Sequence, residues 1–161
     1  MNVWRIIFHP LRLLNEAIFC WLHNGSWTLR SYERELIEAS ATKLAPTNQA
    51  ALESQLASKF FVERMHQDRI TRIHFHWPDS LQKMDLPEDY RLAKLKLRYG
   101  RHSVSVSVEA YKGRIFALQY NKPPKPIVLE KFEIAQIEYG GKADESIARS
   151  IDREEHGDEY S

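Results

Sequence analysis

The chain has 161 residues, a formal net charge of +1 and 28% charged residues. This length is enough for one domain with a buried core, and the net charge excludes attraction of a partner by bulk charge. Cys20 is the only cysteine, which excludes an intrachain disulfide and fits a reducing compartment such as the cytoplasm.

Residues 1–23 are rich in apolar side chains, but Arg5, His9 and Arg12 interrupt the run. A membrane-spanning helix needs roughly 20 predominantly apolar residues, and a signal peptide needs an uncharged core, so neither fits. The pattern predicts an amphipathic helix with a wide apolar stripe, from about residue 10 to residue 23. The side chains predicted to face a membrane or a partner helix are Trp4, Phe8, Leu11, Leu14, Ile18 and Trp21.

Three interpretations of this N-terminal segment stay open. It packs on the rest of the domain, it lies in a membrane interface at the cytoplasmic side, or it pairs with a partner helix, including that of a second copy in a homodimer. Aromatic anchors beside basic residues are typical of interfacial helices. The width of the apolar stripe favours more than a one-sided contact with the core.

Two helices are predicted next. The first covers residues 31–44 and buries its apolar side chains, while Glu33, Arg34, Glu35 and Glu38 form its solvated face. Pro46 ends it, and Thr47 or Asn48 caps a third helix. Residues 60–66 fit a helix or a strand, and we favour a strand because a turn at residues 67–68 and a strand over 69–77 follow.

The most regular alternation lies between Tyr90 and Tyr120. It predicts an antiparallel hairpin around Gly100 in which lysines and arginines lie opposite serines, followed by a third strand. A last strand is predicted over residues 132–139. Together these elements indicate a single α+β domain over residues 24–141, with a helix packed on one face of a sheet of five to six strands. Residues 142–161 form an acidic tail that we expect to be flexible.

Polar and apolar alternation also predicts a basic sheet face. The residues assigned to it are Arg72, His74, His76, Lys94, Lys96 and Arg98. We expect this face to bind an acidic surface of a protein partner, as an inhibitor, immunity protein or adaptor does. No nucleophile elbow, phosphate-binding loop or paired catalytic carboxylate occurs in the sequence, so we expect a non-enzymatic protein without a cofactor.

Two alternatives use the same residues. A nucleic-acid-binding protein could use the basic face, although the sequence places no aromatic ring in that register for base stacking. A metal-dependent enzyme could use His74 and His76, which lie two residues apart on one face of a strand. A zinc site needs at least one further ligand, and the spacing selects none.

Overall fold

The computed structural model describes residue 18, residues 25–124 and residues 131–142 of the chain. In these ranges, helices α2 and α3 precede the sheet, and its six strands pair antiparallel, which confirms the predicted α+β class. The elements are α2 (Ser31–Ala41), α3 (Pro46–Ala57), β1 (Phe60–Met65), β2 (Ile70–Phe75), the 3₁₀ turn η1 (Pro78–Ser80), β3 (Asp89–Tyr99), β4 (His102–Tyr111), β5 (Arg114–Tyr120) and β6 (Glu133–Tyr139).

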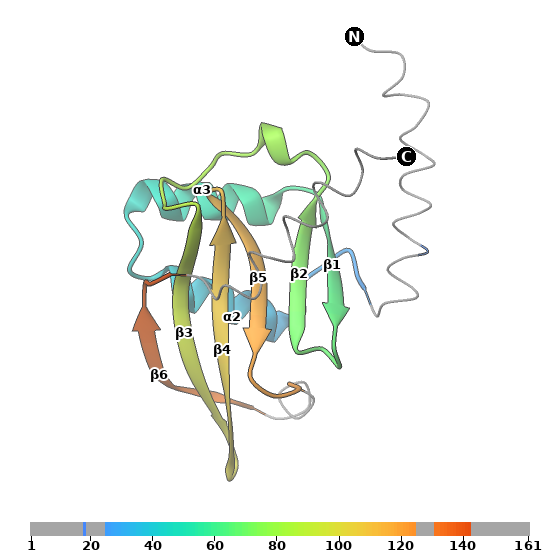
Figure 1. The fold of residues 1–161 in the computed structure, drawn as a ribbon, viewed down its shortest axis with the longest axis vertical. Helices are drawn as coiled ribbons and strands as arrows, with labels where there is room; N and C mark the ends of the chain where they lie inside the picture. The colour runs from blue at the N-terminus through green and yellow to red at the C-terminus, as the bar shows by residue number, and fades with distance from the viewer. Residues whose placement is uncertain (1–17, 19–24, 125–130, 143–161) are drawn as a thin grey trace.

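The strands lie in the order β1-β2-β5-β4-β3-β6. Strands β3, β4 and β5 form a meander, the hairpin β1-β2 extends it at β5, and β6 adds an edge strand beside β3. Both helices lie behind the sheet in Figure 1, so they cover one face. We call the other face the open face, because no helix among the described residues covers it.

The predicted hairpin register is confirmed at the serines. Lys96 pairs with Ser105, and Arg98 pairs with Ser103. The alternation fails at Leu92, which the pattern placed with the lysines. Leu92 is 2% exposed, because a register shift between Arg91 and Ala93 makes it an extra residue in β3.

One apolar core joins the helices to the covered face of the sheet. Its fully buried members include Leu36 and Ile37 of α2 together with Leu95, Leu97 and Leu118 of the strands. Alternation in the strands supplies one wall of this core, and residues spaced three and four apart in the helices supply the other.

Gln55 of α3 anchors the helix layer to the end of the sheet. Its fully buried side chain donates from Nε2 to the carbonyl oxygens of Gln82 (2.8 Å) and Gly113 (3.0 Å), and its Oε1 accepts from the Ile115 backbone N–H (2.9 Å). These bonds satisfy backbone groups that would otherwise be buried without partners. The sequence pattern assigned no role to Gln55.

The helix boundaries differ from the predicted ones. The first described helix, α2, ends at Ala41 rather than at residue 44. Pro46 begins α3 with Ala45 as its N-cap, so capping by Thr47 or Asn48 was wrong. The fixed φ of proline and its missing N–H suit the first turn of a helix, which explains the difference. The strand predicted over residues 60–66 is confirmed as β1.

The predicted N-terminal segment and acidic tail fall mainly outside the described residues. Of the side chains predicted to contact a membrane or helix, Ile18 alone is described; it is helical and 49% exposed. Within the described part of the chain, no helix is long and apolar enough to cross a membrane.

Candidate functional site

Three cations form a row along the open face of β3. Lys94, Lys96 and Arg98 alternate with buried residues of that strand, and all three side chains are exposed. We call them the basic column. Their partners on β4 are serines, whose short side chains leave the charged groups accessible to a partner. The β3-β4 hairpin extends beyond its neighbours at the Gly100 end, as Figure 1 shows.

The neighbouring edge strand carries acidic residues beside the basic column. Glu138 pairs with Lys94, and Glu133 pairs with Arg98, so each pair shares the open face. Glu138 also accepts from Arg91 Nη2 at 3.1 Å. A depression of about 100 Å³ is lined by residues of β3, β4 and β6. These residues are Lys94, Leu95, Lys96, Ser105, Gln136 and Glu138. The cations therefore border acids on one side and serines on the other.

The other three residues of the predicted basic face lie apart from the basic column. Arg72, His74 and His76 belong to β2 or follow it, and β4 and β5 separate them from β3. Arg72 is 6% exposed and His76 is 8% exposed. The six residues thus share the open face but form two groups, of which only the basic column is fully exposed.

Aromatic rings organise the group around β2. Phe61 stacks on His74 with 4.5 Å between ring centroids and 8° between planes. Trp27 stacks on His76 at 5.6 Å and approaches Phe61 edge-on at 6.4 Å. The sequence pattern did not place Trp27 here, because it precedes α2 and reaches β1 through an isolated bridge between Ser26 and Val62.

The two histidines have separate partners. His74 Nε2 lies 3.1 Å from Glu63 Oε2, whereas His76 packs on an indole ring. No group of three His, Cys, Asp or Glu side chains in the described ranges could hold a metal ion. The geometry therefore gives the metal alternative no additional support.

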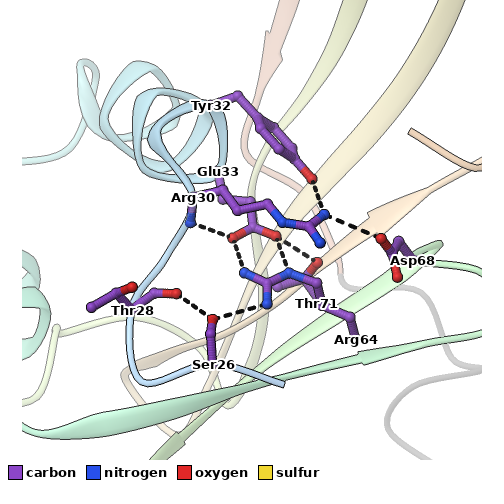
Figure 2. A network of polar contacts seen from close by, with 8 residues as sticks. All are labelled: Ser26, Thr28, Arg30, Tyr32, Glu33, Arg64, Asp68 and Thr71. Atoms are coloured by element: carbon purple, nitrogen blue, oxygen red, sulfur yellow. Dashed lines mark hydrogen bonds and ion pairs between the residues drawn. The ribbon is translucent and has the colours of Figure 1, made fainter. Parts of the chain in front are cut away.

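A buried ionic network lies on the covered side of the sheet, and the sequence analysis missed it (Figure 2). Glu33 is 0% exposed, so its assignment to the solvated face of the helix was wrong. Its carboxylate accepts from Arg64 Nε (2.8 Å) and Nη2 (2.7 Å) and from the Arg30 backbone N–H (2.8 Å). Thr71 Oγ1 donates to it at 3.3 Å. The network joins the first turn of α2 to β1 and β2.

The outer part of this network fixes the turn between β1 and β2. Arg30 Nη1 donates to Tyr32 Oη at 3.2 Å and to Asp68 Oδ2 at 3.1 Å. Arg64 Nη1 donates to Ser26 Oγ at 2.9 Å. The buried Arg64–Glu33 pair with its two hydrogen bonds is the arrangement of a structural ion pair.

Tyr120 lies close to this network and is fully buried. Burial raises the pKa of its phenol well above the ordinary value, and the neighbouring Tyr32 and Glu33 raise this pKa further. Burial also raises the pKa of Tyr32. Among the described residues, the Tyr120 hydroxyl has no hydrogen-bond partner.

We expect Tyr120→Phe to protect the protein against alkaline unfolding. Above about pH 10 the unfolded chain ionises its tyrosines while folded Tyr120 stays neutral, so the free energy of unfolding falls as pH rises. The substitution removes this pH-dependent loss of stability, and at pH 7 it lowers the free energy of unfolding by about 1 kcal/mol or less. Circular dichroism across an alkaline titration measures the unfolding midpoint, which should move to higher pH; an unchanged or lower midpoint contradicts this role of Tyr120.

A second hollow is lined by residues of α2 and α3 and by Thr42, which follows α2. It has a volume of about 580 Å³, a mixed polar and apolar lining, and residues of both charges at its walls. The lining residues are Arg34, Glu38, Ala41, Thr42, Gln49, Leu52, Glu53, Leu56 and Ala57.

Comparisons with known proteins assign no family to this fold and surface. The chain matches no protein-family model, no curated protein and no solved structure.

Proposed function

We propose that this protein is a non-enzymatic interaction module whose basic column binds an acidic patch on another protein. The observation that carries the proposal is the row formed by Lys94, Lys96 and Arg98, three exposed cations in register on one strand. Strand β3 is flanked by β4 and β6, so the backbone positions of the three cations are held at fixed spacing and present a defined row of charge to an acidic patch. Inhibitor, immunity and adaptor proteins bind partners in this manner.

The surroundings of the basic column favour a protein over a nucleic acid. Glu133 and Glu138 lie directly beside it on β6. A continuous phosphate backbone that runs along the column would meet these carboxylates, whereas an acidic protein patch can be confined to the width of the cations. No exposed aromatic ring lies within the column, and single-stranded nucleic acids normally stack on such rings.

We further propose a cytoplasmic location at the inner face of a membrane, with residues 1–23 as the attachment. The 49% exposure of Ile18 supports this part of the proposal, because an apolar side chain of the predicted stripe is left accessible. Interfacial helices bury such a stripe at the boundary between headgroups and acyl chains.

Affinity capture with the full chain tests the protein-docking proposal. The immobilised protein is exposed to native lysate with and without nuclease treatment, and bound material is eluted with increasing salt. We expect one stoichiometric acidic protein that nuclease does not release and that salt elutes, since exposed charge pairs are screened. Capture of nucleic acid alone, across many sequences and with a steep salt dependence, would replace this proposal with the nucleic-acid alternative.

A further inference from the structure

Two tryptophans are exposed at one corner of the folded domain. Trp27 is 45% exposed and Trp77 is 42% exposed. Both lie beside His76, since the Trp27 ring stacks on that imidazole and Trp77 is its neighbour in the chain. We call this pair the tryptophan corner. Large aromatic side chains are mostly buried in proteins, so two exposed indoles on segments that both adjoin His76 indicate a surface that is used.

The fold holds both tryptophans in place. Ser26, next to Trp27, is fixed to β1 because its N–H donates to Val62 (2.9 Å) and its carbonyl accepts from Val62 (2.7 Å). The carbonyl of Trp77 accepts from the Ser80 N–H (3.2 Å) and hydroxyl (2.9 Å) in η1. Ring contacts of Trp27 with His76 and Phe61 complete the support. The Trp27 ring is thereby fixed and loses little conformational entropy on binding, whereas the hydrogen bonds of Trp77 hold its backbone.

We infer that the tryptophan corner inserts into the interface of a phospholipid bilayer and extends the membrane contact of residues 1–23. This inference rests on the membrane attachment in the proposed function. Indole rings favour the headgroup region, because one edge is apolar and the other carries an N–H donor. The N-terminal segment reaches the described fold at Gly25, two residues before Trp27, so both surfaces lie together in the chain. Exposed Lys59, whose carbonyl accepts from His76 N–H at 3.1 Å, adds a cation for anionic headgroups.

Vesicle co-sedimentation of the full chain tests the inference. The probe is unilamellar vesicles of phosphatidylcholine with phosphatidylserine, compared with phosphatidylcholine alone. We expect Trp27→Ser combined with Trp77→Ser to weaken binding by roughly tenfold or more, from the apolar area that two half-exposed indoles bury. Tyr139→Ser is the matched control, because Tyr139 is 37% exposed on β6 at the opposite edge of the sheet, and binding should stay unchanged.

The outcomes separate the inference from the proposal on which it rests. If the double variant and the wild-type protein bind vesicles equally well, the tryptophan corner has no role in membrane binding, and attachment by residues 1–23 stands. Wild-type protein that binds no vesicles would overturn both. A second measurement covers loss of folding. With Trp4, Trp21 and Trp77 replaced by phenylalanine, which keeps these side chains apolar and aromatic, brominated acyl chains should quench the fluorescence of Trp27. An unquenched signal in sedimented protein would contradict insertion.

Discussion

Glu33→Ala should lower the free energy of unfolding by about 3–5 kcal/mol, because it removes the carboxylate that neutralises a buried guanidinium. Arg64 and Glu33 side chains are 2% and 0% exposed, and two hydrogen bonds join them. Without the carboxylate, the charge of Arg64 stays in a site of low dielectric constant, and the Arg30 N–H at the start of α2 loses its acceptor. Urea denaturation followed by circular dichroism measures this change.

Two further variants show whether loss of the ion pair causes the destabilisation expected for Glu33→Ala. Glu35→Ala changes an exposed glutamate of the same helix and should alter stability by less than about 0.5 kcal/mol. Arg64→Met combined with Glu33→Leu removes both charges and should recover much of the loss. Equal destabilisation by the Glu33 and Glu35 variants would show that the network in Figure 2 contributes nothing beyond helix propensity.

Gly113→Ala should destabilise the fold by more than about 2 kcal/mol, because both the backbone conformation and the available space require glycine. Gly113 has a φ of +74°, and an added Cβ would lie 2.5 Å from the Met84 carbonyl oxygen. Its own carbonyl accepts from the Met84 N–H at 2.8 Å and from Gln55 Nε2 at 3.0 Å. Displacing this turn therefore disturbs the contact of α3 with the sheet, which thermal unfolding reports.

Gly100→Ala is the matched control for the Gly113 variant. Gly100 also has a positive φ, +54°, but nothing lies within 4 Å of an added Cβ. The substitution should cost only the conformational term, about 1 kcal/mol. If the two alanine variants unfold at the same temperature, the close approach of Met84 to Gly113 has no energetic consequence.

The sequence predicts much of the fold because local patterns specify its largest unit. Period-two alternation in β3 and β4, with a glycine turn between them, determines which residues pair and which face they occupy. Lys96 opposite Ser105 is such a pair. The order of strands in the sheet has no comparable local signal, because β6 joins β3 across a long connection. The extra residue at Leu92 shows in the sequence only as two adjacent apolar residues, Leu92 and Ala93, which do not specify a register shift by themselves.

The candidate site, like the fold, could be predicted from the sequence only in part. Exposure of the basic column follows from alternation, but its distance from Arg72 depends on strand order, which alternation does not determine. Glu33 did leave a signal, since it lies three and four residues before the buried Leu36 and Ile37 and therefore on their side of the helix. Arg64 likewise continues the spacing of Phe60 and Val62. The prediction placed Glu33 in solvent because it followed the residue type rather than the position in the helix, and it assigned no role to Arg64.

The most direct test of the interaction proposal is the affinity of the captured protein for a charge-reversed basic column. Lys94→Glu with Lys96→Glu should weaken the complex by more than about 100-fold at low salt, because attraction becomes repulsion at two adjacent contacts. Lys43→Glu with Lys83→Glu makes the same change in net charge at exposed positions after α2 and after η1, and should leave affinity nearly unchanged. With folding confirmed by circular dichroism, equal affinity of the two double variants, measured by isothermal titration calorimetry, would contradict docking through this face.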